Sequence, residues 1–270
     1  MPSASLRIGL IGYGAIGRQV ADAISDGTIA GATCSGILVR TERPEDDPHV
    51  LDLTTSPKVF LTAKHDVVVE MAGHQAVRDH GERCLKRGAD LMLTSVGALT
   101  DDGLHARLLK AAGDGKRKLL IPSAGVGALD ILTAAAQGGL SSVTMTVTKD
   151  ARSWKGTIAE QAHNLDALKA PTLLYEGPVR EGARLYPQNV NISAAVALAG
   201  LGLDRTQLRI MADPAHVPHI VEVEAQGHFG RFSFREEITP TTENRKTGRL
   251  VAMAVIKALR QLTATQVIGG

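Results

Sequence analysis

The chain has 270 residues, a formal net charge of +2, 44% hydrophobic residues and 21% charged residues. This composition is ordinary for a globular protein and differs from that of disordered or membrane-embedded chains. Lysine and arginine are dispersed along the sequence, so the charge pattern does not predict binding to nucleic acid. The length allows two modest domains or one large one.

Three observations bear on the compartment. The longest apolar stretch, residues 190–203, contains two polar residues and is shorter than the ~20 residues of a membrane span, so we expect a buried helix there. The first strand begins within about six residues of Met1, which leaves no room for a secretory leader and predicts a cytoplasmic location. Cys34 and Cys84 lack CxxC spacing and nearby metal ligands, so we expect free thiols and no metal site.

Residues 8–24 predict a nucleotide site. They comprise a short apolar strand, a G-x-G-x-x-G motif and a helical period. Gly12 would allow the tight turn, Gly14 the approach of a pyrophosphate and Gly17 close helix–strand packing. Ala15 and Ile16 would lie at the helix N-terminus, where unpaired N–H groups attract anions. We expect NAD or NADP to bind here; the alternative is a glycine-rich turn without a ligand.

The next predicted strand, residues 33–39, ends where such folds usually carry an acid for the ribose 2′-hydroxyl. Arg40 stands there instead, followed by Thr41 and Arg43. A hydroxyl and two cations are suited to a 2′-phosphate, so Arg40 predicts that NADP is accepted. The alternative is a solvated loop arginine.

Further strands at residues 66–71, 91–94 and 119–121 alternate with helices that end near residues 87 and 112. This alternation predicts an α/β fold, with a Rossmann-type doubly wound parallel sheet, over residues 1–122. Ligands bind such sheets beyond the carboxyl ends of the strands. We therefore expect Ala72 and Gly73, which follow the strand at 66–71, to contact the coenzyme.

The pattern then changes. Residues 143–148 alternate apolar and polar side chains, and residues 221–224 and 231–236 do likewise on either side of a glycine-containing turn. Period-two alternation predicts strands with one polar face, and the two segments around the turn predict an antiparallel hairpin. We expect a second α+β substrate and oligomerisation domain at residues 123–245, and a last helix within residues 246–270 that packs back on the first domain.

Three polar clusters in the second half have two interpretations each. Asn189 and Asn191 can cap a helix or can contact a coenzyme or a substrate carboxylate. His219 lies at a loop-to-strand junction and by itself is most simply structural. Lys246 and Thr247 belong to a helix entry that capping explains.

Five motifs in order make the pattern specific. They are GYGAIG (12–17), PSAGVGALD (122–130), YPQNVN (186–191), the segment from Asp213-Pro214 to His219, and ENRKT (243–247). Together they resemble the L-aspartate dehydrogenase family over nearly the whole chain, with one departure at Val217, where the family often has asparagine.

The resemblance implies NAD(P)-dependent oxidative deamination of L-aspartate to iminosuccinate, or the reverse reaction with ammonia, in an assembly that we expect to be a homodimer. It implies that Ala124 and Asn189 contact the coenzyme and that His219 is the active-site histidine. The dianionic substrate needs cationic or N–H partners. The candidates for this role are Lys149, Asn191, Lys246 and Thr247.

Alternative functions share the fold. A dihydrodipicolinate reductase would carry a paired-histidine and lysine segment that is not found in this sequence. A semialdehyde dehydrogenase would need a cysteine where Ser123 begins the second domain. A regulator that senses nicotinamide dinucleotides would bind them without turnover.

Overall fold

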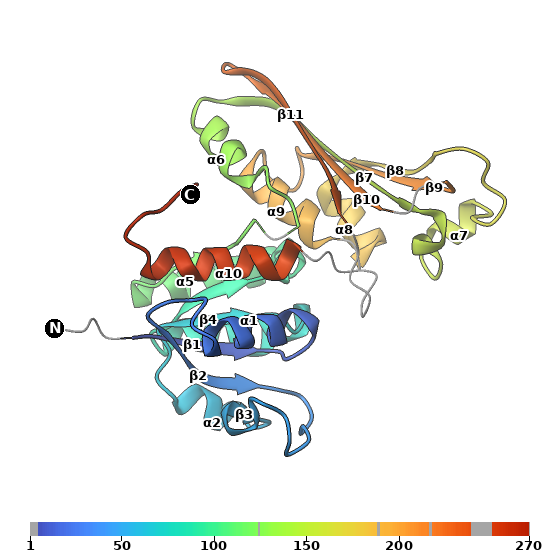
Figure 1. The fold of residues 1–270 in the computed structure, drawn as a ribbon. Helices are drawn as coiled ribbons and strands as arrows, with labels where there is room; N and C mark the ends of the chain where they lie inside the picture. The colour runs from blue at the N-terminus through green and yellow to red at the C-terminus, as the bar shows by residue number, and fades with distance from the viewer. Residues whose placement is uncertain (1–4, 124, 188–189, 216–217, 239–249, 270) are drawn as a thin grey trace. The chain divides into compact units, whose positions relative to one another are not determined.

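The computed structural model describes residues 5–123, 125–187, 190–215, 218–238 and 250–269. The chain divides into two compact units (Figure 1). Unit 1 comprises residues 1–124 and 251–270, and unit 2 comprises residues 125–250. None of the helices within the described ranges is long and apolar enough to cross a membrane.

Unit 1 contains a six-stranded sheet in the order β3-β2-β1-β4-β5-β6, in which every neighbouring pair is parallel. The strands are β1 (Leu6–Ile11), β2 (Ala32–Leu38), β3 (Leu53–Thr54), β4 (Val67–Glu70), β5 (Asp90–Leu93) and β6 (Leu119–Leu120). The sequence prediction of a Rossmann-type doubly wound sheet is confirmed. The strands that follow β1 in sequence are added first on one side of it and then, from β4, on the other side. Ligands bind such sheets at this switch point, beyond the carboxyl end of β1.

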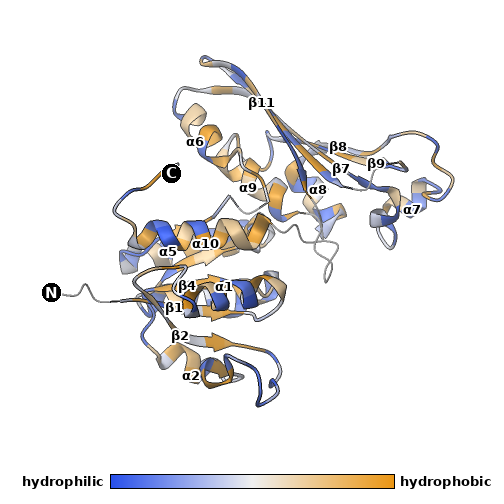
Figure 2. Ribbon diagram, viewed as in Figure 1, coloured by the Kyte–Doolittle hydropathy of each residue, from blue (hydrophilic) through white to orange (hydrophobic). Residues whose placement is uncertain are grey.

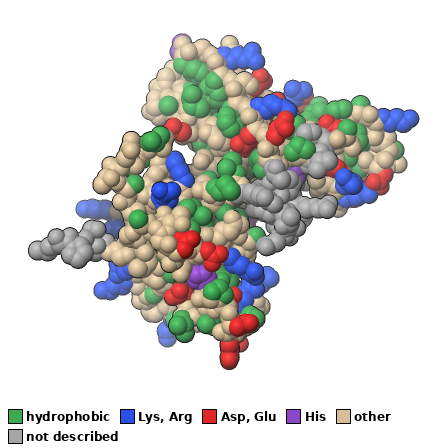
Figure 3. Space-filling view, viewed as in Figure 1, with side chains coloured by type: hydrophobic (Ala, Val, Ile, Leu, Met, Phe, Trp, Pro, Cys, Tyr) green, Lys and Arg blue, Asp and Glu red, His purple; other side chains and the backbone are tan. Residues whose placement is uncertain are grey.

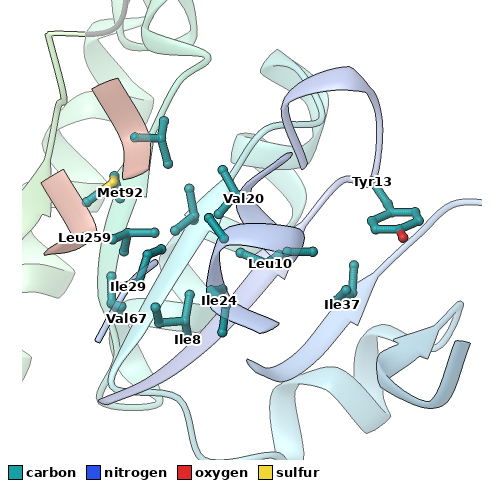
Figure 4. Close-up of a cluster of buried hydrophobic side chains, with 14 of the residues drawn as sticks. Ile8, Leu10, Tyr13, Val20, Ile24, Ile29, Ile37, Val67, Met92 and Leu259 are labelled. Atoms are coloured by element: carbon teal, nitrogen blue, oxygen red, sulfur yellow. The ribbon is translucent and has the colours of Figure 1, made fainter. Parts of the chain in front are cut away.

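Helices cover both faces of this sheet. They are α1 (Ala15–Ser25), α2 (Pro57–Thr62), α3 (His74–Ala76), α4 (Glu82–Lys86), α5 (Asp102–Gly115) and α10 (Leu250–Thr263). Val20 of α1 and Leu259 of α10 are buried in one cluster with Ile8 of β1 and Val67 of β4 (Figure 4). Because parallel strands are covered on both faces, all four residues of β4 are buried and the central strands are strongly hydrophobic (Figure 2).

Unit 2 contains a five-stranded mixed sheet in the order β11-β10-β7-β9-β8. The strands are β7 (Leu140–Asp150), β8 (Thr172–Pro178), β9 (Gln207–Asp213), β10 (His219–Gly227) and β11 (Gly230–Ile238). The helices are α6 (Leu129–Gln137), α7 (Ala159–Ala162), α8 (Val179–Leu185) and α9 (Asn191–Ala199). The second domain is therefore a mixed α+β unit, as the change of pattern predicted.

The sheet of unit 2 has a buried face and a polar face. Val143, Met145 and Val147 of β7 are buried, whereas the threonines between them are partly exposed. The register pairs Val147 with Val221 of β10, so buried residues of neighbouring strands lie on the same face. This face therefore forms the core side of the sheet.

Candidate dinucleotide and substrate sites

The glycine-rich turn after β1 has the conformation that the motif predicts. Gly12 has a φ of 102°, which disfavours any residue with a side chain. A Cβ at Gly17 would collide with the carbonyl oxygen of Gly12, so only glycine permits this contact between α1 and the turn. A Cβ at Gly14 would meet nothing within 4 Å, which leaves its backbone open to a ligand.

A cleft of about 680 Å³ opens beside this turn within unit 1. Gly12, Gly14, Arg40 and Ala72 all line it, so four of the predicted coenzyme residues lie around one space. Ala15 and Ile16 form the first turn of α1, which carries no acidic residue. An open backbone at a helix N-terminus whose first turn has no carboxylate fits the pyrophosphate of NAD or NADP.

The loop after β2 is attached to the glycine-rich turn through Tyr13. The Tyr13 hydroxyl donates to Oδ1 of Asp47 at 2.8 Å, and the Arg43 guanidinium donates to the Tyr13 carbonyl oxygen at 3.3 Å. His49 is hydrogen-bonded to Asp22 of α1 at 2.9 Å. These contacts hold the exposed Arg40 at the rim of the cleft. Tyr13 was not among the residues predicted from the sequence.

Glu70, the last residue of β4, is a buried carboxylate that was not among the site residues predicted from the sequence. Its Oε1 accepts hydrogen bonds from the backbone N–H groups of Ala72 and Gly73, both at 2.7 Å. Ser95 donates its hydroxyl to Oε1 at 2.9 Å and its backbone N–H to Oε2 at 3.2 Å. Burial raises the pKa of Glu70, and these four hydrogen bonds oppose that rise.

Glu70 therefore fixes the loop that the sequence assigned to the coenzyme. It holds Ala72 and Gly73 at the carboxyl end of β4, where Ala72 lines the cleft. A sequence signal existed, because one acidic residue ends the apolar run Val67–Val69, and two small residues, Ala72 and Gly73, follow after Met71. An unpaired carboxylate would be costly at that depth, so its presence indicates local N–H partners.

In unit 2 the predicted substrate residue Lys149 and the predicted active-site residue His219 lie on the same face of the sheet. Ile220 of β10 pairs with Thr148 of β7, so antiparallel register places His219 beside Lys149. Both residues are buried, with 7% of His219 and 8% of Lys149 exposed. The Lys149 ammonium lies 5.4 Å from the centre of the Trp154 ring, a cation–π contact.

The other predicted site residues are not brought into this pair. Asn191 is exposed and begins α9. Ala124, Asn189, Lys246 and Thr247 lie outside the described residues. Within the described ranges, no group of three or more histidine, cysteine, aspartate or glutamate residues is placed to hold a metal ion. Lysine and arginine are scattered over the face shown in Figure 3 rather than gathered in a stripe.

Two family models match the chain. Residues 12–122 match the NAD-binding domain of homoserine dehydrogenase, and residues 130–262 match the C-terminal domain of aspartate dehydrogenase. The L-aspartate dehydrogenase of Cupriavidus necator is 39% identical, over 94% of this chain and 96% of its own length. That of Ralstonia pickettii is 38% identical with the same coverage.

The fold has a solved counterpart. The crystal structure of aspartate dehydrogenase from Thermotoga maritima has a TM-score of 0.76 and 24% identity, and the match covers 98% of this chain and 99% of that one. The ordered motifs, the glycine-rich cleft and the full-length relatives agree, and the chain belongs to the L-aspartate dehydrogenase family.

Proposed function

We propose that this protein catalyses the NAD(P)-dependent oxidative deamination of L-aspartate to iminosuccinate and the reverse reductive amination. The observation that carries the proposal is the buried pair of Lys149 and His219 on one sheet face, in a chain 39% identical to an L-aspartate dehydrogenase. Buried cationic and imidazole groups side by side suit a dianionic substrate whose amine must lose a proton.

His219 is the proposed base. A protonated ammonium group cannot form the C=N bond, so the α-nitrogen must be deprotonated before hydride leaves Cα. An imidazole has a pKa near neutrality, which makes it an efficient acceptor of that proton. The bound dinucleotide supplies the hydride acceptor at nicotinamide C4.

Lys149 is the proposed carboxylate anchor. It is the residue before the end of β7, and burial beside Trp154 strengthens any charge pairing that its ammonium makes with a substrate carboxylate. Asn191, Lys246 and Thr247 are further candidates for the second carboxylate. Ala124 and Asn189 are proposed coenzyme contacts through the family resemblance.

For the coenzyme we propose that NADP(H) serves at least as well as NAD(H). Arg40 lines the cleft at the end of β2, where an acid would repel a 2′-phosphate. Thr41 and Arg43 line the same cleft and add a hydroxyl and a second guanidinium.

A spectrophotometric screen at about 340 nm tests the function, with amino and hydroxy acids offered alongside each coenzyme. We expect activity confined to L-aspartate among common amino acids. Equal or greater turnover of L-glutamate, L-alanine or homoserine would contradict the substrate assignment. Binding of the coenzyme without turnover of any of these compounds would favour the sensing regulator.

We also propose a cytoplasmic homodimer. The two cysteines of the chain, Cys34 and Cys84, are free, which suits a reducing compartment. The dimer follows from the family resemblance and is tested by light scattering, which should give twice the 28.5 kDa mass of the chain.

A further inference from the structure

Glu236 is a half-buried acidic group in unit 2 to which the proposed reaction gives no role. It lies near the end of β11, and one of its oxygens, Oε1, is buried without a hydrogen-bond partner among the described residues. The backbone N–H of Gly127 donates to its carboxylate. Burial raises the pKa of Glu236 to about 7, because the charged form has too few partners.

The sheet register places Glu236 next to His219. His219 pairs with Ile238 of β11, and Val221 pairs with Glu236. Glu236 is therefore a diagonal neighbour of His219 on the same face, at a separation that long side chains can bridge. Lys149 flanks His219 from the other side, on β7.

This face carries no second acidic residue among the described residues of the five strands. Strand alternation places Asp150, Asp213, Glu222 and Glu237 on the opposite face. Glu176 and Glu224 lie there too, and ion pairs with Arg209 and Arg231 hold them. Among the described residues of the five strands, Glu236 is thus the acidic side chain on the face that carries His219 and Lys149.

We propose that Glu236 binds the amine nitrogen of the substrate, as the α-ammonium group of L-aspartate in one direction and as ammonium in the other. A cationic nitrogen needs acceptors, and Lys149 cannot provide one. The unpaired Oε1 provides an acceptor close to His219, which then takes the proton from the nitrogen held there. The inference rests on the proposed function and assigns the amine, rather than the carboxylates, to this side of the site.

The test is Glu236→Gln, which keeps the size of the side chain and an acceptor for Gly127 but removes the charge. The KM for L-aspartate is measured in oxidation, and the KM for ammonium is measured in reductive amination of oxaloacetate. We expect both values to rise about tenfold or more, as the loss of one charged hydrogen bond predicts. The KM for oxaloacetate and the Kd for NADPH, followed by its fluorescence, should stay within about twofold.

Glu237→Gln is the matched control, because Glu237 is the next residue on β11, faces the other way and is held by Arg235 at 2.7 Å. It should leave all four constants unchanged. If Glu236→Gln does not fold, Glu236→Asp keeps the charge but withdraws it by one methylene, and it should give an intermediate KM for ammonium.

Unchanged KM values for ammonium and aspartate in folded Glu236→Gln would overturn the inference. A rise in the Kd for NADPH with no specific effect on ammonium would also overturn it, because Glu236 would then act through the Gly127 segment. A wild-type protein without aspartate activity would overturn the proposed function and this inference together. Active wild type beside an unaffected variant would overturn the inference alone.

Discussion

The two units provide their candidate sites with different chemistry. In unit 1 the glycine-rich turn offers backbone groups to the cleft at Gly12 and Gly14, with the Arg40 side chain at the rim, and a carboxylate at Glu70 holds the neighbouring loop. In unit 2 the candidate groups are the ionisable side chains of Lys149 and His219, which are buried, and of Glu236, which is half-buried; they come from three strands. A backbone site suits a ligand that must only be bound, whereas proton transfer and charge recognition require side chains.

This difference predicts which kinds of substitution would impair each unit. A side chain added at Gly12 or Gly17 would strain or block the turn, so unit 1 depends on the absence of side chains. Unit 2 depends on particular functional groups at fixed register positions. Substitutions in the two units should therefore separate coenzyme binding from chemistry.

The largest effect is expected at His219. His219→Ala should lower kcat by about 10²–10⁴-fold with the Kd for coenzyme nearly unchanged, because it removes the base and leaves the cleft of unit 1 intact. His219→Asn keeps a hydrogen-bond donor but cannot take a proton, so it should not restore kcat. His228→Ala, at the exposed turn between β10 and β11, is the control. A folded His219→Ala enzyme with a third or more of wild-type kcat would show that this histidine is structural.

Glu70→Gln should act on unit 1. The amide nitrogen of glutamine cannot accept the hydrogen bond that Oε2 accepts from Ser95. We expect a loss of about 1–3 kcal/mol in the free energy of unfolding and a higher Kd for NADPH, since the Ala72–Gly73 loop loses its fixed position. Urea unfolding and fluorescence titration measure the two quantities. Glu82→Gln, a surface change beside Lys86, should alter neither quantity. If Glu70→Gln leaves the Kd for NADPH unchanged, the Ala72–Gly73 loop does not contribute to coenzyme binding.

Arg40→Asp should change coenzyme preference rather than chemistry. The new carboxylate repels a 2′-phosphate, so the binding of NADP⁺ should weaken relative to that of NAD⁺ by about 1–3 kcal/mol. This corresponds to a change of roughly 5- to 150-fold in the ratio of Michaelis constants. Arg87→Asp, at the exposed end of α4, provides the charge-matched control. If the ratio does not move, Arg40 does not contact the 2′-phosphate.

Glu236→Gln should make the stability of unit 2 less dependent on pH. A carboxyl whose pKa is raised from 4.5 to about 7 stabilises the fold below pH 4.5, and that contribution is lost as pH rises to 7. Glutamine does not titrate, and solvent screens the half-exposed Glu236, so the free energy of unfolding of the variant should rise by about 1–2 kcal/mol relative to wild type between these pH values and hold that difference above pH 7. Because His219 and Lys149 on the same face are present in both proteins, their titration largely cancels. Urea unfolding at several pH values measures the gain, and a constant difference would contradict the burial of this charge.

The smallest effect is expected from Tyr13→Phe. It removes the hydrogen bond to Asp47 and keeps the ring that Arg18 and Arg43 contact. We expect a loss of about 0.5–1.5 kcal/mol in the free energy of unfolding and a modest rise in the Kd for NADPH, because the loop that carries Arg40 is less firmly attached. An unchanged melting temperature would show that Asp47 does not restrain this loop.

The sequence by itself determined the α/β fold of unit 1, the glycine-rich turn and the change to a mixed sheet in unit 2. These features follow from local properties: apolar periodicity, the freedom of glycine at positive φ, and the steric limit at Gly17. The family was also within reach, because five ordered motifs are linear features. The proposed role of His219 came from those motifs and not from its own local pattern.

The tertiary structure alone decided which polar groups meet. Nothing local indicated that Glu70 accepts from Ser95, or that Glu236 lies diagonally opposite His219, because these pairs depend on the register of strands that are distant in the sequence. Side-chain alternation has a period of two, so a shift of one residue in that register would move Glu236 to the other face. The physical reason is that register is fixed by the packing of the whole sheet, which no short segment encodes.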